Sequence, residues 1–445
     1  MGTTMNMANR VRAALLVSLA VAAAIDTARA QQAQPGEREQ TFELGLTTGG
    51  SWSDNIGRVP ADEDEGSLGL AGVILGYRQR SARLEADVDA NVVYEHYFDD
   101  TFDDDLLGGI DGTVRAEIVP ERLSWFVQDN FGQIASDPFS ADRPDNREDI
   151  NYFTTGPDFT FRLGSAMSVL LSGRYSNTAY ETSELDGERL GGTVALSREL
   201  SGNSSFSLNA TTEQVEFDNT TFNTDYDRHQ GFLRYDARGS RTTLTIDAGY
   251  TSLDTGTDTP DAPLARISVT RQVSASSTFT LRAGSEYSSG ADLFRDTQGA
   301  QGAQLSGQSI VATNDPFEYR FGALEWDFNR NRTTIGLALQ HGKEEYETLT
   351  QLDRTLTSFN AYFTRQVSRT AELRLFGAYE DEQFDELDGE DQELQLGAAL
   401  AWDVGRTLEV RVQLDHFDRD SSNVLTEYTE NRASVFLTWF PIGRQ

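Results

Sequence analysis

The chain has 445 residues, no cysteine and a formal net charge of -34, with 71 Asp and Glu against 37 Lys and Arg. This charge argues against binding to nucleic-acid phosphates, and the absence of cysteine excludes disulfides, thiolate metal sites and a cysteine nucleophile. A chain of this length usually forms about three domains, although single β-barrels also reach this size.

The first 30 residues are typical of a secretory signal peptide. Two arginines in MGTTMNMANRVR precede the apolar run AALLVSLAVAAAI, and DTARA ends in a small-x-small cleavage site after Ala30. The alternative, a membrane-anchor helix, is less favoured because such a helix needs about 20 apolar residues. We expect a linker over 31–40, a barrel over 41–440 and a short tail over 441–445.

Short turn-forming stretches rich in Ser, Gly, Asn and Arg recur along the rest of the chain, and each joins two runs of alternating polarity. In chain order they lie near 80–82, 119–122, 164–166, 201–204, 238–241, 274–277, 329–332, 368–369 and 405–406. Longer acidic loops separate them, for example FDDTFDDD (98–105) and DEQFDELDGEDQE (381–393). The alternation of short turns and long loops is typical of outer-membrane barrels, in which the short turns are periplasmic.

The runs between turns and loops are longer than ordinary strands. RLEADVDANVVYEHY (83–97) alternates apolar and acidic residues over its whole length, whereas soluble strands usually have about 5–6 residues. Nine short turns between an inner start and an inner end predict an all-β, transmembrane, antiparallel up-and-down β-barrel of about 20 strands. If one hairpin is miscounted, the number is about 18.

A soluble β-sandwich or propeller is the structural alternative. Its strands would be shorter, and a soluble protein of this size would need an apolar core between its sheets. The hydrophobic fraction is only 38% and the mean hydropathy is -0.48. A barrel with a wet interior accounts for these values, because only one face of each strand must be apolar.

The register of each strand follows from placing its apolar face toward lipid. In RLEADVDANVVYEHY, for example, Leu84, Val88 and Val92 then face outward. The opposite faces carry the side chains that we expect to line the pore: Glu85, Asp87, Asp89, Arg115, Glu117, Arg162, Arg174, Asp247, Arg266, Arg282, Glu286, Glu318, Arg320, Glu372, Arg374, Glu409, Arg411 and Asp415.

Most of these charges have a structural interpretation. Several strands carry an acid and an arginine on one face, so neighbouring strands can form ion pairs across the wall. The alternative is a charged eyelet that selects the solute. The face with Glu85, Asp87 and Asp89 favours the eyelet, because Arg83 is the only arginine on that face of its own strand.

The long loops are predicted to be external, solvated and acidic. Such loops can hold divalent cations together with lipopolysaccharide, or repel an anionic polymer that has already left the cell. Their sequences lack the glycine and glutamate frame of an EF-hand, so we expect no dedicated metal site. We expect the outer-membrane lipid and lipopolysaccharide to be partners of the barrel.

Sequence signals for catalysis are absent. The four histidines, at 96, 229, 341 and 416, form no zinc-ligand spacing or HExxH motif, and the chain has no GxSxG elbow and no P-loop. We therefore expect no enzymatic activity and no cofactor.

The space after the signal peptide is too short for an N-terminal plug domain, because only QQAQPGEREQ precedes the first expected strand. A barrel this wide without a plug leaves an aqueous channel. The segment 289–315 is long, rich in Gly and low in charge, and is the candidate for a loop that folds inward and narrows the channel. The alternative is an ordinary external loop.

Two stretches and a repeated turn suggest a family. SWSDNI (51–56), NREDINYFTTGPDFTFRLG (146–164) and the TRQVS-type turns resemble outer-membrane β-barrel proteins encoded with bacterial exopolysaccharide systems. The resemblance implies a porin-like barrel in the outer membrane of a Gram-negative bacterium, which exports a polysaccharide handed over by a periplasmic export protein. It assigns no substrate-binding residue.

Three functions follow as hypotheses. The first is the export of an exopolysaccharide. The second is a general diffusion porin that prefers cations because its outer mouth is acidic. The third is a structural or adhesive surface barrel that conducts nothing.

Overall fold

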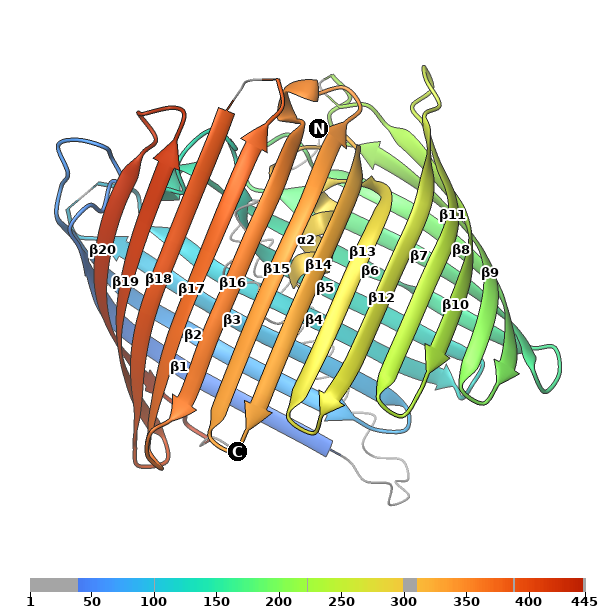
Figure 1. The fold of residues 1–445 in the computed structure, drawn as a ribbon, viewed down its shortest axis with the longest axis horizontal. Coiled ribbons are helices and arrows are strands. Elements are labelled where there is room, and N and C mark those ends of the chain that lie inside the picture. The colour runs from blue at the N-terminus through green and yellow to red at the C-terminus, as the bar shows by residue number, and fades with distance from the viewer. Residues whose placement is uncertain (1–38, 100, 222, 299–309, 387–388, 443–445) are drawn as a thin grey trace, which may run out of the picture.

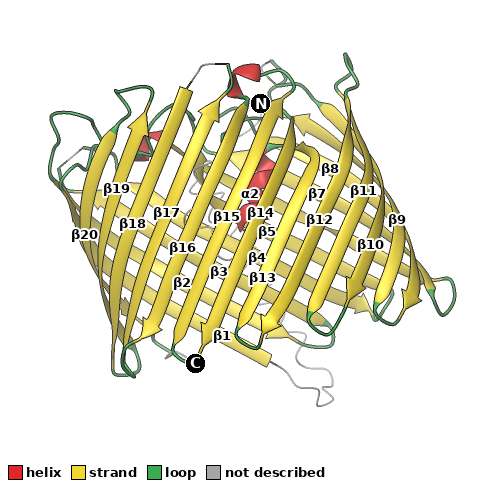
Figure 2. Cartoon of the chain, in the orientation of Figure 1, coloured by secondary structure: helices red, strands yellow, loops and turns green. Residues whose placement is uncertain are grey.

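The computed structural model describes the chain except for residues 1–38, 100, 222, 299–309, 387–388 and 443–445. The predicted signal peptide, and all but the end of the linker that follows it, therefore lie outside the described residues. The described part is an antiparallel sheet of twenty strands (Figures 1 and 2). The prediction of about 20 strands is confirmed.

The strands follow one another as simple hairpins. The first ten are β1 (Glu39–Ser53), β2 (Gly66–Arg80), β3 (Leu84–Tyr97), β4 (Asp105–Val119), β5 (Leu123–Ala135), β6 (Arg147–Arg162), β7 (Met167–Tyr180), β8 (Gly187–Ser201), β9 (Ser204–Phe217) and β10 (Tyr226–Arg238). The second ten are β11 (Thr242–Asp254), β12 (Asp261–Ser274), β13 (Ser277–Ser288), β14 (Phe317–Arg330), β15 (Thr333–Tyr346), β16 (Arg354–Gln366), β17 (Ala371–Phe384), β18 (Gly389–Val404), β19 (Leu408–Ser421) and β20 (Tyr428–Trp439).

The sheet closes on itself because β1 also pairs with β20, from Leu46↔Trp439 to Ser53↔Arg432. Closure gives β1 and β20 a partner on both sides over Leu46–Ser53 of β1, and pairing of backbone groups is what a lipid environment demands. The nine short turns all join strands at one end of the barrel, as the sequence predicts, and this end is periplasmic by the usual rule for such barrels.

The outer surface carries an apolar band. Large apolar side chains on it are well exposed, such as Leu339 at 47% and Leu414 at 58%, which is the reverse of the pattern in a soluble protein. A closed barrel with this exterior is a protein of the Gram-negative outer membrane. No helix among the described residues is both long and apolar enough to cross a membrane.

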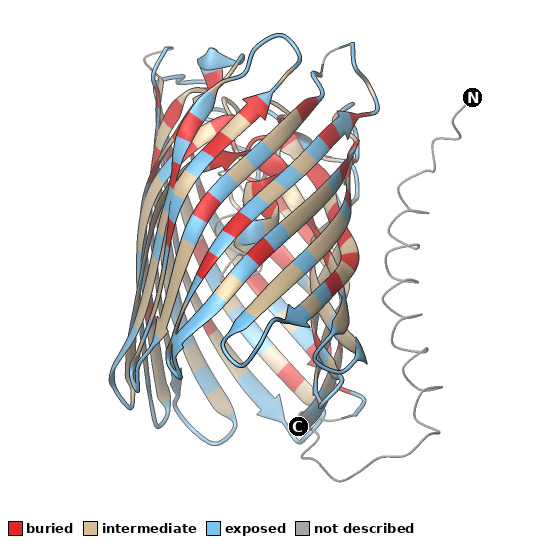
Figure 3. Cartoon of the chain, turned by 90° about the vertical axis from the view of Figure 1, so that its right-hand side faces the viewer, coloured by how far each residue is buried: buried red, intermediate tan, exposed pale blue. Residues whose placement is uncertain are grey.

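Buried residues gather mostly toward the end of the barrel that carries the long loops (Figure 3). In the described parts of these loops there are three short helices: η2 (Pro144–Asn146), α2 (Gly290–Gln298) and η5 (Thr350–Leu352). The only described clusters of buried apolar residues include residues near the outer ends of strands, for example Tyr97 on β3 and Tyr180 on β7. The core of this protein is thus located at the mouth of the barrel.

Candidate functional site

Helix α2 identifies the inner face of the wall. Phe294 of α2 is fully buried in a cluster with Ile134 of β5, Ile150 of β6 and Tyr180 of β7, and Figure 1 shows α2 within the outline of the barrel. Ile134 is therefore on the lumen side. Because directly paired residues share a face, the strand registers extend this assignment around the whole wall.

The registers place most of the predicted pore-lining residues on the lumen side. Arg115, for example, pairs with Phe126, eight positions before Ile134 on the same face of β5. The residues with lumen-side register are Glu85, Asp87, Asp89, Arg115, Glu117, Arg162, Arg174, Asp247, Arg266, Arg282, Glu286, Glu372, Arg374, Glu409, Arg411 and Asp415.

The structure corrects the predicted positions of Glu318 and Arg320. They alternate with Phe317, Tyr319 and Phe321, and Phe321 pairs with Gly284 of the lumen face, so both charged residues face outward. Arg320 forms an ion pair with Glu345 at 3.1 Å on that outer surface. The prediction failed because both residues lie at the outer end of β14, where the outward face has left the lipid and tolerates charge.

The carboxylates of β3 have arginine partners that are not on their own strand. Arg78 of β2 contacts Asp87 at 3.0 Å and Asp89 at 3.2 Å, and Arg80 lies 3.9 Å from Glu85. All of these side chains are about half exposed or more, so each pair contributes little to stability. The acidic face of β3 is thus partly neutralised from the neighbouring strand.

Two carboxylates farther along the wall each hold two arginines. Asp158 of β6 lies 2.6 Å from Arg174 and 3.6 Å from Arg115. Asp247 of β11 lies 2.7 Å from Arg234 and 3.0 Å from Arg266. We call these two groups the wall clamps.

Each wall clamp also has an aromatic ring beneath its guanidinium groups. Arg115 and Arg174 lie 5.6 and 5.0 Å from the ring centre of Phe126, and Arg234 and Arg266 lie 5.5 and 5.1 Å from that of Phe232. These distances allow cation–π attraction. Together the ring and the shared carboxylate hold the guanidinium groups along the wall instead of letting them project into the lumen.

Three aromatic rings on the lumen side lie against glycines of the neighbouring strand. They are the pairs Phe321 with Gly284, Tyr362 with Gly336 and Phe376 with Gly397, each directly opposed in the register. A Cβ atom added to Gly336 or Gly397 would lie 2.1 Å from the ring, and at Gly284 it would lie 2.7 Å away. The rings therefore occupy the space that a side chain would fill, and we call these pairs the ring seats.

The mouth of the barrel is narrowed by two loop segments that fold inward. The first is α2 together with residues 310–316, between β13 and β14. Val311 forms a parallel bridge with Ala135 of β5, so this segment runs along the inner wall. The predicted inward fold of the segment 289–315 is thus present in its described parts, Gly290–Gln298 and residues 310–315.

Asp292 fixes α2 to strands β8 and β10 of the wall. It forms ion pairs with Arg189 of β8 at 3.3 Å, Arg228 of β10 at 3.0 Å and Arg295 of α2 at 3.3 Å. Only 5% of its side chain is exposed. Burial alone would raise the pKa of Asp292, but the three arginines outweigh burial and hold the pKa below its ordinary value.

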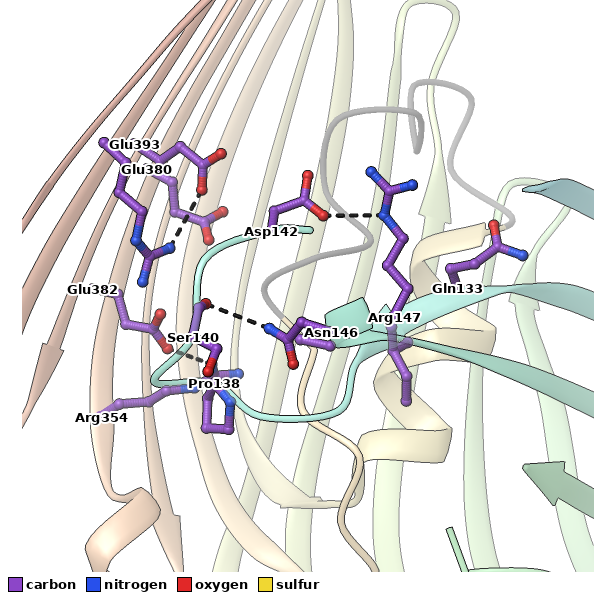
Figure 4. Close-up of a pocket in the computed structure, with 13 residues that line it drawn as sticks. Gln133, Pro138, Ser140, Asp142, Asn146, Arg147, Arg354, Glu380, Glu382 and Glu393 are labelled. Carbon is purple, nitrogen blue, oxygen red and sulfur yellow. Dashed lines mark hydrogen bonds and ion pairs between the residues drawn. The ribbon is translucent and has the colours of Figure 1, made fainter. Parts of the chain in front are cut away.

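The second segment, residues 136–146 between β5 and β6, crosses the lumen toward β16–β19 (Figure 4). Asp142 in this loop pairs with Arg58 at 2.6 Å and with Arg147 at 3.1 Å, and Arg58 also holds Glu430 of β20 at 2.8 Å. Burial would raise the pKa of Asp142, but Arg147 and Arg58 lower it below its ordinary value. Asp142 thus ties three distant parts of the chain together.

A small cavity remains between this loop and the wall (Figure 4). Its loop side includes Pro138, Ser140 and Asn146, and its wall side includes Glu380 and Glu393. Arg354 of β16 crosses the base of the cavity and pairs with both Glu344 and Glu382. No group of three or more potential metal ligands occurs among the described residues.

Sequence reasoning missed the ring seats and the inward fold of residues 136–146. The ring seats had a weak signal, because a glycine interrupts the alternating pattern at 284, 336 and 397, and an interior glycine in a strand marks a close approach. The partner ring follows only from the register. Residues 136–146 gave no comparable signal.

No family model matches this chain, and no curated protein matches it. Among solved structures, it is similar to a mutant of the ferric enterobactin receptor of Pseudomonas aeruginosa, with 10% identity and a TM-score of 0.47 over 92% of this chain and 81% of that one. It is also similar to Pseudomonas aeruginosa OccK2 in complex with glucuronate, with 10% identity and a TM-score of 0.37 over 91% and 99%. A loop-deletion form of the Vibrio cholerae outer-membrane protein OmpT matches with 10% identity and a TM-score of 0.33 over 91% and 100%.

Proposed function

We propose that this protein is an outer-membrane channel that exports a polysaccharide. The observation that carries the proposal is the inner wall. Twenty strands enclose the lumen, and the wall clamps and ring seats hold arginines and aromatic rings close to the strands. A wide bore with a polar lining suits a long, hydroxyl-rich polymer, and barrels with slightly fewer strands already leave an aqueous channel.

The mouth fits the same function. Both inward segments are fixed by ion pairs and by apolar contacts of side chains such as Phe294 and Phe139, so their described parts narrow the outlet. We propose that a periplasmic export protein delivers the polymer at the end with the short turns. The surrounding lipopolysaccharide is the proposed partner of the outer rim.

Two measurements test the proposal. Purified barrels in planar bilayers are expected to conduct, and a barrel that conducts nothing would favour a structural or adhesive role. A strain that lacks this protein is expected to retain its polysaccharide in the periplasm. Normal polymer secretion by that strain would overturn the export function.

A second function, a diffusion channel that prefers cations, is favoured by one observation. Carboxylates outnumber arginines on the lumen side of the wall, where Asp111, Glu325 and Asp327 add to the predicted acids. This excess attracts small cations. The two functions differ in the deletion strain, because only the export channel is needed for polymer secretion.

A further inference from the structure

The three ring seats occupy successive hairpins of one sector of the wall. They join β13 to β14, β15 to β16 and β17 to β18. Neighbouring strands lie about 4.7–4.9 Å apart, so the seat on β13–β14 and the seat on β15–β16 are about 10 Å apart around the wall. Tyr362 and Phe376 are directly paired on the adjacent strands β16 and β17. The seats therefore form a row and are not a single isolated contact.

Each ring is held on the glycine side and also has a polar or aromatic neighbour. Tyr319 stacks on Phe321, the Tyr362 hydroxyl donates to Asp327 at 3.5 Å, and Arg374 lies 5.6 Å from the ring centre of Phe376. Three atoms of the Phe376 ring would lie 2.1–2.6 Å from a Cβ on Gly397, so the end of the ring covers this glycine. The Tyr362 ring covers Gly336 in the same way, with contacts of 2.1–2.8 Å. Both side chains are only half-buried, which leaves ring surface toward the lumen.

The row also changes height along the barrel. Phe321 lies near the outer end of β14, whereas Tyr362 on β16 and Phe376 on β17 lie nearer the periplasmic turns. Phe321 stacks on Tyr319 with ring centres 4.9 Å apart. It also packs against a cluster that touches Leu293 of α2. The row thus leads from the lower wall to the narrowed mouth.

We propose that Phe321, Tyr362 and Phe376 form a contact track for the sugar rings of a saccharide chain, a proposal that rests on the proposed export function. The faces of pyranose rings carry C–H groups and are apolar, while their edges carry hydroxyls. An aromatic face on the wall binds the former, and acids and amides of the neighbouring lumen positions accept hydrogen bonds from the latter. The track requires no charge on the sugar, so the substrate class is a neutral, hydroxyl-rich glycan.

The first test measures how linear neutral oligosaccharides of glucose block the ion current of single barrels in planar bilayers. In Tyr362→Leu and Phe376→Leu, the oligosaccharide concentration for half block is expected to rise roughly three- to tenfold, because one aromatic contact is lost in each. Phe359→Leu is the matched control, since Phe359 lies on the same strand as Tyr362, faces outward and is 42% exposed. Equal block in wild type and both lumen variants would overturn the track, as would an equal effect of the control.

The second test concerns the seats themselves. In Gly336→Ala the new methyl group displaces the Tyr362 ring from the wall, so the conductance of the open channel is expected to fall. Gly322→Ala is the control, because a Cβ there meets no atom within 4 Å. Unchanged conductance in Gly336→Ala would show that the ring does not lie in its seat and would overturn the proposal.

These outcomes separate the track from the export function. The block of current is measured on the isolated protein and does not depend on what the cell exports. If oligosaccharides do not block the current while the deletion strain still fails to secrete its polymer, the track is wrong and export stands. If oligosaccharides block the current but the deletion strain secretes normally, the export function is wrong and the site remains a saccharide site.

Discussion

At the scale of single residues, Arg78 determines the electrostatic character of β3. Its guanidinium group contacts both Asp87 and Asp89, and the three side chains face the same lumen. The sequence predicts the face on which the acids lie. It does not reveal that an arginine of the preceding strand lies across from them, because that contact depends on the register of β2 against β3.

We expect Arg78→Gln to increase the preference of the channel for cations. The change removes the positive partner of two lumen carboxylates without removing a large contribution to stability, since the pairs are exposed and worth about 0–1 kcal/mol each. The reversal potential in a potassium chloride gradient measures the effect. Arg365→Gln is the control, because Arg365 faces outward near the periplasmic end of β16, and an equal shift there would contradict the prediction.

Residue-level prediction from the sequence succeeded where the lipid imposes a strict alternation and failed where it does not. Asp247, Arg266 and Arg282 lie on the lumen side, because the outward positions next to them are the apolar Ile246, Ile267 and Leu281. Glu318 and Arg320 lie outside, at the end of a strand that extends beyond the apolar band. The alternation of polarity therefore predicts the face of a residue only within the height of the lipid.

At the scale of elements, helix α2 depends on a single aspartate. Asp292 binds three arginines in a buried position, and Phe294 supplies the apolar contact beside it. The sequence identified this segment by its glycines and its low charge. The sequence did not predict the partners of Asp292, because Arg189 and Arg228 lie on strands that are distant from it in the chain.

We expect Asp292→Asn to release α2 from the wall. The change leaves buried arginines without their carboxylate, and breaking a buried ion pair in this way costs about 3–5 kcal/mol. The open-channel conductance is expected to rise and to fluctuate more. Asp296→Asn is the control, since Asp296 is on the same helix and its side chain is 65% exposed. A conductance equal to that of wild type in Asp292→Asn would contradict the role of Asp292 in holding α2.

The ion pairs of Asp292 also predict a pH dependence. The folded-state pKa of Asp292 lies below the ordinary value of about 3.9, so its stabilising effect is complete above about pH 4 and is lost as the pH falls toward the folded-state pKa. The pKa of Asp142 is also held below its ordinary value. Conductance is therefore expected to be constant from neutral pH to about pH 5 and to rise only below about pH 4; a rise near pH 6 would show that another group controls the mouth.

At the scale of the whole molecule, closure depends on the seam between β1 and β20. This seam has fewer paired residues than that between β1 and β2, which runs along the whole of both strands. Side chains reinforce its outer end. Ser53 donates to Glu430 at 2.7 Å, and Asp54 accepts from the backbone N–H and the side-chain amide of Asn431 at 2.7 and 2.8 Å.

We expect Asp54→Ala to weaken the closed barrel by about 0.5–1.5 kcal/mol, because it removes two exposed hydrogen bonds across the seam. The temperature at which the folded barrel loses its faster migration in gel electrophoresis measures the effect. Glu63→Ala, in the exposed loop between β1 and β2, serves as the control. An equal transition temperature in Asp54→Ala and wild type would show that the backbone pairs alone hold the seam.

The architecture was the most predictable property of this chain. Nine turns and a membrane-set strand length determine twenty strands, because each strand must cross the same thickness of lipid. The ion pairs that hold the inward segments at the mouth were not predictable from the sequence. Asp142, Arg58 and Glu430 come from three separate loops and strands, and only the closed barrel brings them together.

The ring seats and the wall clamps have a consequence for movement through the bore. Phe376 rests on a glycine and Arg174 on a carboxylate and a ring, so neither needs to change rotamer when a solute passes. The resistance to transit then comes from water displaced ahead of the solute and from the two segments at the mouth. A lining of this kind gives low friction, and it allows a long chain to slide while its individual contacts remain weak.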